Sequence, residues 1–423
     1  MKRLSTFLIT VALIIGLVGC APAPTQYNLT VSSTEGGSVT APGEATSTYE
    51  EGEVINLVAT PSEYYHFVSW TGDVGTIADV NDANTTITMK ADYSVTANFE
   101  LEPWNYTITL NLHCVPDFNV FAPWTAKVEN ATGPDGGRFT FNFTYGDTPY
   151  SYQDSLTALS AGVADLGQLS GDTFYLGSIG YLPFLFPDTA SCAYATYNLL
   201  GTGVEDWDAL GELDDVKILL STPLTPAQWF GNIPVRTLAD LAGVPVRAEA
   251  AGVGPTIEAL GATAREIPNY NEGAALSTGF VEGCFLNYCA GAGLVLNVTS
   301  YVTEVGLYPR MFVLAMNRAV YEDLHPDARA LLDTFCTAEK SVEHALAQDA
   351  AQSKCKSAIN DYRASHGQPA IYVLPQAELD NWKTACANVY TDWVDHMSTL
   401  GFDGQGLYDR AVELIAEYEA SAS

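Results

Sequence analysis

Apolar and polar side chains alternate in short runs between residues 27 and 100. Runs such as YNLTVSS and EVINLVATP follow a period of two, which places successive side chains on opposite faces of a strand. Clusters of Gly, Pro, Asn and Asp separate the runs and mark turns. The pattern predicts a small all-β domain over residues 27–100, in which the indole of Trp70 fills the core.

From residue 106 the pattern changes to strand-like runs that alternate with helical ones. In chain order we predict a strand at 107–112, a helix at 121–130, a strand at 138–143, a helix at 151–161 and a strand at 163–169. This βαβαβ order predicts a parallel sheet with helices on both faces. Strands at 216–221 and 244–248, with a helix at 254–260, are predicted to open a second such unit.

A repeated stretch of sequence indicates that the two units are similar. ALSAGVADLG at 158–167 recurs as ALSTGFVEG at 275–283, and each stretch has the pattern of a helix followed by a strand. Residues 323–415 are mostly helical in pattern, with one strand expected near 371–374. The predicted fold class is therefore α/β, with two lobes and a helical C-terminal part, preceded by the all-β domain.

The N-terminus has the features of a bacterial secretion signal. Lys2 and Arg3 precede an apolar stretch, Phe7–Val18, that is too short to span a bilayer comfortably. The following LVGC resembles a lipobox, so we predict a signal peptide over residues 1–19 and acylation of Cys20. An ordinary signal peptide with a chance cysteine is the alternative. Residues 20–26 are predicted to form a linker, with the lipid as the only membrane attachment of an extracytoplasmic protein.

The charge composition of the chain argues against some classes of binding partner. Lysine and arginine number 18 and aspartate and glutamate 50, which gives a formal charge of −32 spread along the chain. So acidic a chain argues against nucleic acid and anionic membrane surfaces as partners. It also makes an arginine at the end of a buried strand conspicuous.

Seven cysteines follow Cys20, at 114, 192, 284, 289, 336, 355 and 386. The predicted compartment permits disulfides, but an odd number leaves at least one thiol unpaired or linked between molecules. The candidate pairings are a local bridge between Cys284 and Cys289, or one pair among Cys336, Cys355 and Cys386. The sequence has no CxxC, so no zinc ribbon is predicted, and we predict no other metal site.

The sequence predicts that the protein binds a ligand and does not catalyse a reaction. The GxSxG, HExxH, Walker A and GxGxxG templates are all absent from the sequence, so we predict neither catalysis nor a cofactor. Arg247 has the strongest case as a binding residue, because it lies near the end of a predicted strand and its planar guanidinium fits a carboxylate with two parallel hydrogen bonds. The alternative is a structural ion pair with Glu249 or Glu266.

Polar residues near other strand ends are further candidates, because these ends face the ligand in open α/β folds. They are His113, Cys114, Gln168, Ser170, Tyr270, Asn271 and Asn287. Each can equally be a turn residue. Arg236 is instead expected to be a solvated residue at the start of a helix.

Short signatures stand in a particular order between residues 106 and 335. They are YTITLNLHC, GGRFTFNF, ALSAGVADLGQLS, LPFLFP, VRTLADLAGVPVR, ALSTGFVEG and LHPDARALLDTF. Their order and spacing resemble the DctP-type binding proteins of tripartite ATP-independent periplasmic (TRAP) transporters. The resemblance implies a type II periplasmic-binding-protein clamshell over residues 106–420, with a small organic acid bound between its lobes and two membrane permease subunits as partners. It also implies that Arg247 grips the ligand carboxylate.

Two departures from the family refine this expectation. Many carboxylate binders of the family carry a second arginine in the segment that here is PAQWFGN, residues 226–232, without a cation. Trp229, next to Phe230, is predicted instead to form an aromatic wall, so we expect a monocarboxylate with an apolar or aromatic body. Residues 27–100 resemble the divergent InlB B-repeat, which is unusual ahead of such a receptor. A surface adhesion or sensing protein is therefore the competing hypothesis.

Overall fold

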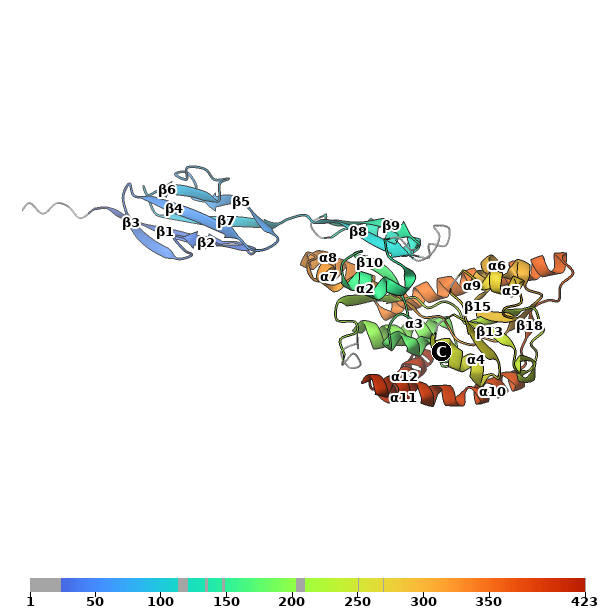
Figure 1. Ribbon diagram of the computed structural model, residues 1–423. Coiled ribbons are helices and arrows are strands. Elements are labelled where there is room, and N and C mark those ends of the chain that lie inside the picture. The colour runs from blue at the N-terminus through green and yellow to red at the C-terminus, as the bar shows by residue number, and fades with distance from the viewer. Residues whose placement is uncertain are drawn as a thin grey trace, which may run out of the picture. The chain divides into compact units, whose positions relative to one another are not determined.

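The computed structural model describes residues 24–112, 121–133, 136–146, 149–202, 210–249, 251–268 and 270–422. The predicted signal peptide, Cys20, His113 and Cys114 lie outside these ranges. The chain divides into two compact units between Pro103 and Trp104 (Figure 1).

The N-terminal unit is all-β, as its alternating pattern predicts. Its strands are β1 (Gln26–Ser33), β2 (Gly37–Ala41), β3 (Thr46–Glu50), β4 (Val54–Pro61), β5 (Tyr65–Gly72), β6 (Asn84–Thr88) and β7 (Tyr93–Leu101). They form two sheets, with strand orders β3-β1-β7-β5 and β2-β4-β6. Trp70 is 2% exposed in the core, and its indole N–H donates to the Asp82 carbonyl at 3.1 Å. The indole therefore has the central position expected of it.

We expect ligand binding to survive removal of the N-terminal unit. The unit has its own apolar core, and Trp104 belongs to the other unit, where its ring packs 5.0 Å from that of Phe139. A chain beginning at Pro103 should therefore bind ligand with the affinity of the full-length protein, measured by calorimetric titration. A tenfold loss or more would mean that the β unit contributes to the site.

The first sheet of the large unit has the order β11-β17-β10-β8-β9. Its strands are β8 (Asn105–Leu112), β9 (Arg138–Tyr145), β10 (Leu166–Ser170), β11 (Val216–Ser221) and β17 (Phe312–Asn317), and α1 (Ala122–Asn130), α2 (Ser155–Ser160) and α3 (Thr189–Tyr197) accompany it. β8 pairs in parallel with β9 and β10, whereas β17 is antiparallel to β10 and β11. The parallel pairing predicted for the three βαβαβ strands is therefore confirmed, and the sheet as a whole is mixed, because β17 returns between β10 and β11 in the opposite direction.

The second sheet has the order β14-β13-β15-β12-β16-β18. Its strands are β12 (Gln228–Gly231), β13 (Pro245–Ala248), β14 (Thr263–Glu266), β15 (Gly283–Leu286), β16 (Tyr301–Glu304) and β18 (Tyr372–Val373), with α4 (Gly254–Ala259), α5 (Glu272–Ser277) and α6 (Tyr288–Leu294) beside them. The prediction that residues 216–221 open this second unit is wrong. That segment is β11, which β17 holds in the first sheet.

The repeated sequence stretch forms the same structure twice. In each copy a short helix, α2 or α5, ends at a glycine with a φ of 72°, Gly162 or Gly279. The next residue donates its backbone N–H five residues back, from Val163 to Ala158 at 3.0 Å and from Phe280 to Ala275 at 2.9 Å. This is a Schellman motif, which favours glycine because the left-handed conformation crowds a Cβ. The strand that follows, β10 or β15, lies inside its sheet.

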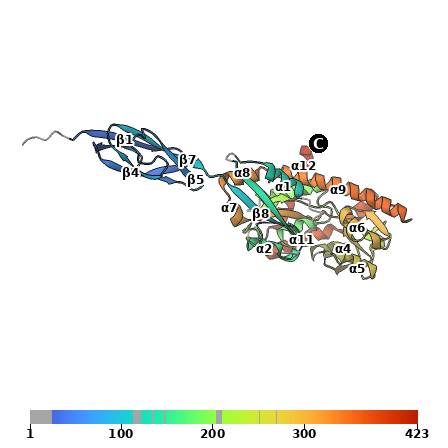
Figure 2. The same ribbon diagram turned by 90° about the horizontal axis from the view of Figure 1, so that it is seen from above.

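The C-terminal part is mostly helical, as predicted. Its helices are α7 (Arg318–Glu322), α8 (Pro326–Asp333), α9 (Ala338–Ser365), α10 (Gln376–Ala385), α11 (Ala387–Leu400) and α12 (Gly404–Ala422). Figure 2 shows α9 as a long helix that reaches from α1 to α6. Among the described residues, no helix is both long and apolar enough to cross a membrane.

The disulfide joins cysteines that neither candidate pairing had matched. Cys289 at the start of α6 is bonded to Cys355 in the middle of α9, over a sequence separation of 66 residues. Cys284, Cys336 and Cys386, like Cys192, are buried free thiols. The predicted pairings are wrong because the packing of α6 on α9 brings together two distant segments.

Candidate ligand-binding site

Two chain segments cross between the sheets side by side, and one of them carries the polar residues of the site. Leu224 donates its N–H to the carbonyl of Arg310 at 2.8 Å, and Ala227 donates to that of Tyr308 at 2.8 Å. An isolated bridge between Pro226 and Pro309 belongs to the same ladder. Tyr308 and Arg310 are thus held between β16 of the second sheet and β17 of the first.

Arg247 lies on β13 beside this crossing, and its side chain is 1% exposed. Its Nη1 is 3.5 Å from Oε2 of Glu249, and Nη1 of Arg310 is also 3.5 Å from that oxygen. Nε of Arg247 donates to the carbonyl of Ile267 at 3.3 Å. Of the two acids expected as alternative partners, Glu249 makes the contact, whereas Glu266 on the edge strand β14 is exposed.

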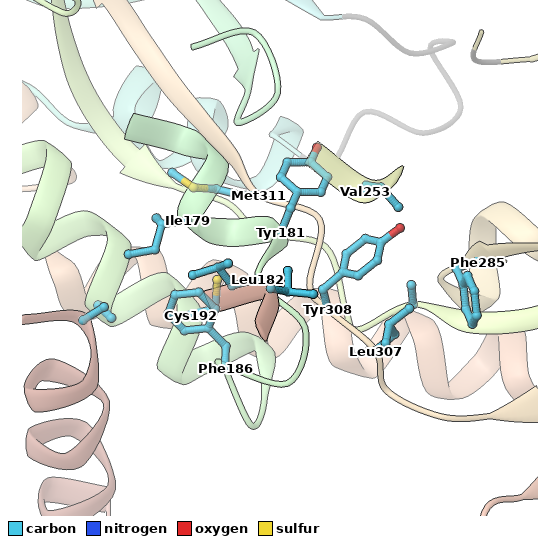
Figure 3. Close-up of a cluster of buried hydrophobic side chains, with 14 of the residues drawn as sticks. Ile179, Tyr181, Leu182, Phe186, Cys192, Val253, Phe285, Leu307, Tyr308 and Met311 are labelled. Atoms are coloured by element: carbon cyan, nitrogen blue, oxygen red, sulfur yellow. The ribbon is translucent and has the colours of Figure 1, made fainter. Parts of the chain in front are cut away.

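Aromatic hydroxyls extend this cluster toward the first sheet. Tyr308 donates to Oε1 of Glu249 at 3.3 Å, and its ring centroid is 5.7 Å from that of Tyr181. Burial is the main reason that the pKa of Tyr308 lies well above its usual value, so the phenol stays protonated. The Tyr181 hydroxyl is 3.1 Å from Oγ of Ser170, at the end of β10. Figure 3 shows the two tyrosines in the same apolar cluster as Leu182 and Met311.

The contacts therefore run from Ser170 through the two tyrosines to Glu249 and the arginines. They unite two of the predicted site residues, Ser170 and Arg247, which come from strands of different sheets. Cys284 lies opposite Arg247 on β15, and burial raises the pKa of its thiol to about 12 although Arg247 opposes the shift. The thiol is consequently neutral at physiological pH. The arrangement is suited to holding an anion and offers no reactive thiolate.

The other predicted residues occupy different settings. Gln168 is half-buried in the middle of β10, opposite Leu314 of β17. Asn287 caps α6, since its Oδ1 accepts from the N–H of Ala290 at 2.9 Å and from Gln352 at 3.2 Å. Tyr270 is 71% exposed with a φ of 69°, and Asn271 is also exposed. His113 and Cys114 fall outside the described residues.

Trp229 makes its contacts in the core of the large unit. Its side chain is fully buried, its indole N–H donates to the Ile233 carbonyl at 3.3 Å, and its ring packs edge-on against Phe285 at 5.5 Å. A Cβ at Gly283 would lie only 2.1 Å from the indole. The structure thus places the segment predicted as an aromatic wall in the core, since all four residues of β12 are buried.

The sequence interpretation missed Tyr308 and Arg310, which contact Glu249. No signal in the sequence marks Arg310, whose position depends on how the chain crosses between sheets.

A separate pocket of about 250 Å³ lies at the β16–β18 edge of the second sheet, and none of the predicted ligand-binding residues lines it. Arg236 does line it, with its guanidinium 5.5 Å from the ring centroid of Tyr372. Arg236 is otherwise exposed, as predicted for a residue before a helical turn.

Comparison with known families decides the class of the large unit. The model described as bacterial extracellular solute-binding protein, family 7, matches residues 116–396. The chain belongs to this family. A second model, the divergent InlB B-repeat domain, matches residues 27–103. The family 7 resemblance and the B-repeat resemblance found in the sequence are both confirmed.

Solved structures of family 7 proteins share the two-lobed fold. A TRAP solute-binding protein from Rhodoferax ferrireducens T118, in complex with copurified benzoate, is 27% identical with a TM-score of 0.66, and the match covers 75% of this chain and 100% of that one. One from Desulfovibrio salexigens is 22% identical with a TM-score of 0.64, over 76% and 98% of the two chains. A marine metagenome protein specific for aromatic acid ligands is 22% identical with a TM-score of 0.66, over 74% and 99%. Proteins of this class bind small molecules outside the cytoplasm and work with membrane permeases.

Proposed function

We propose that this protein captures a monocarboxylate with an aromatic or apolar body and delivers it to a TRAP permease. The observation that carries the proposal is Arg247, buried at 1% exposure and close to a second arginine. A guanidinium withdrawn from water is best stabilised by a carboxylate that it can grip with two hydrogen bonds. The benzoate found with the Rhodoferax protein, at 27% identity, supports an aromatic body.

The surroundings of Arg247 also favour such a ligand. The rings of Tyr181 and Tyr308 present flat apolar surface beside the charged groups, and their hydroxyls can orient a polar substituent. In this mechanism the carboxylate binds Arg247 and the aromatic body packs on side chains of both lobes. Contacts that exist only when both lobes touch the ligand then drive closure, and the permease receives the closed form.

The test is calorimetric titration of the purified protein with benzoate and with its uncharged isostere benzamide, after mass spectrometry of any copurified ligand. Binding of benzoate, with benzamide at least a hundredfold weaker, is the expected result. Equal binding of the two compounds would refute the carboxylate mechanism, and copurification of an uncharged sugar would refute the ligand class.

We further propose that Cys20 carries a lipid anchor, on the strength of the LVGC sequence after a short apolar stretch. Cys20→Ala should release the protein into the soluble extracytoplasmic fraction or leave it unprocessed. Fractionation followed by mass spectrometry of the N-terminus distinguishes these results. A variant that stays in the membrane fraction with normal cleavage would show that the anchor lies elsewhere.

The fused B-repeat supports a second candidate function, adhesion to or sensing of a surface. This function requires no transport partner, whereas a TRAP receptor needs membrane permease subunits. Two permease genes beside the receptor gene, together with ligand uptake that depends on the receptor, would favour transport.

A further inference from the structure

We infer that the pocket at the β16–β18 edge of the second sheet is a second binding site, which takes a small oxyanion through Arg236 and Arg363. Its walls come from residues 234–236, residues 301–303 of β16 and residues 369–372, and its volume is about 250 Å³. A water molecule occupies about 30 Å³ in the liquid, so a phosphate or carboxylate group has ample room. None of the ligand-binding residues predicted around Arg247 lines this pocket, so its ligand is independent of the proposed function.

Arg363 is the feature that indicates an anion. It lies in the last turn of α9 and is 0% exposed. Its Nε donates to the Pro369 carbonyl at 2.6 Å and its Nη2 to the Ser300 carbonyl at 2.5 Å. Within the described part of the chain, Nη1 has no hydrogen-bond partner and no carboxylate forms an ion pair with the guanidinium. The carbonyls at the end of α9 offset only part of its charge, whereas a buried cation is normally paired with an anion.

The hydrogen bonds of Arg363 place its guanidinium at the junction of two pocket walls. Pro369 lines the pocket, and Ser300 directly precedes Tyr301, which lines it from β16. Burial lowers the pKa of Arg363 and the phenol of Tyr301 opposes this shift, but an arginine remains protonated at physiological pH. Arg363 therefore contributes a positive charge from behind the wall, although its side chain is shielded from solvent.

Arg236 supplies a second cation, on the pocket surface. Its side chain is exposed, and its guanidinium lies 5.5 Å from the ring centroid of Tyr372, which also lines the pocket. Asp240 is engaged by the backbone, since its Oδ2 accepts the N–H groups of Arg236 at 2.9 Å and Thr237 at 2.8 Å. The guanidinium of Arg236 makes no hydrogen bond or ion pair with any described residue. Its N–H groups are thus available to grip an oxyanion with two parallel hydrogen bonds.

The two arginines have different roles in this site. Arg236 contacts the oxygens of the anion, and the hydroxyl of Tyr301 can donate to a further oxygen. Arg363 strengthens binding through its buried charge, because attraction across the poorly solvated wall is less screened than in water. Two cations favour a dianion, so hydrogen phosphate should bind more tightly than acetate. A bound anion links residues 234–236 to residues 369–372 and should raise the melting temperature.

The first experiment is calorimetric titration of the full-length protein with inorganic phosphate and with acetate at low ionic strength, where exposed charges are least screened. Arg236→Gln should weaken phosphate binding at least tenfold. Arg265→Gln is the matched control, since it removes an exposed arginine from the opposite edge strand β14, and it should leave the phosphate affinity within twofold. Absence of phosphate binding, or equal binding by Arg236→Gln and the unmodified protein, would overturn the inference.

The second experiment separates this pocket from the site around Arg247. Arg236→Gln should bind benzoate within threefold of the unmodified protein, and Arg247→Ala should lose benzoate but keep its phosphate affinity. Loss of phosphate binding in Arg247→Ala would place the phosphate at Arg247 and overturn the inference. Failure of the unmodified protein to bind benzoate would count against the proposed function alone.

The contribution of the buried arginine is tested by comparing Arg363→Lys with Arg363→Gln. The lysine variant keeps the charge and should retain most of the phosphate affinity, whereas the glutamine variant should lose at least tenfold. Thermal melts without phosphate monitor folding, because Arg363 also fastens the end of α9. A folded Arg363→Gln protein with unchanged phosphate affinity would show that this arginine is purely structural. The Arg236 series decides the existence of the site whether or not the Arg363 variants fold.

Discussion

Replacing Arg247 by alanine is expected to abolish carboxylate binding while the protein remains folded. The guanidinium is buried on β13, and a ligand carboxylate withdrawn from water would lose its charged partner. Loss of one partner from a buried ion pair typically costs about 2–5 kcal/mol, which corresponds to a roughly 30- to 5,000-fold weaker affinity. The measurement is calorimetric titration with benzoate or with the acid that copurifies.

Two further variants make this result specific. Arg247→Lys should recover only part of the affinity, because an ammonium cannot reproduce the two parallel hydrogen bonds of a guanidinium. Arg265→Ala is the matched control, since Arg265 stands beside Arg247 in the register of β13 and β14 but is exposed. It should bind as the unmodified protein does. Normal binding by Arg247→Ala, with an unchanged thermal melt, would refute the assignment of this arginine to the ligand.

Replacing Trp229 by alanine is expected to destabilise the large unit strongly and to leave the affinity of the folded protein nearly unchanged. The indole is fully buried against Phe285, and Gly231 and Gly283 leave the space that it fills. Truncation of a buried tryptophan to alanine usually costs about 3–5 kcal/mol, because it removes apolar contacts and leaves a cavity.

Urea denaturation followed by circular dichroism measures this loss, and titration in the absence of urea measures binding. Trp393→Ala is a useful comparison, since this partly buried indole lies in α11 and donates to Oγ of Ser178 at 2.8 Å. It should cost less than Trp229→Ala. A Trp229→Ala protein of normal stability that has lost its ligand would restore the idea that this side chain contacts the ligand.

The local sequence patterns predicted the positions of individual strands and helices better than they predicted which sheet each strand joins. The strands at residues 107–112 and 216–221 and the helix at 121–130 lie close to where the periodicity indicates them. The assignment of 216–221 to the second sheet failed because β17, nearly a hundred residues later, pairs with it in the first. Sheet membership depends on long-range pairing, which the periodicity of a segment does not encode.

In the candidate site, too, residues marked by a local sequence pattern could be singled out, whereas residues positioned by long-range packing could not. Arg247 could be singled out as a candidate because a lone arginine at the end of an apolar strand is chemically unusual, and its contact with Glu249 was among the alternatives that the sequence offered. The burial of Trp229 could not be predicted, because a strand buried on both faces has no alternation to distinguish a core residue from one that lines a site. Arg310 became visible only when the crossing segments brought it to Glu249.

The disulfide between α6 and α9 constrains how the lobes can rotate relative to each other. Up to Asp349, α9 is tied to the first sheet and its helices: Ser341 accepts the N–H of Ser221, and Asp349 accepts from Thr189 at 2.7 Å. From Gln352 onward it is tied to the second, through Asn287 and the covalent bond at Cys355. A rotation must therefore either bend the helix within the turn that joins these two halves or break one set of hydrogen bonds. Because α9 is one continuous helix over both halves, it helps to set the angle between the lobes when no ligand holds them together.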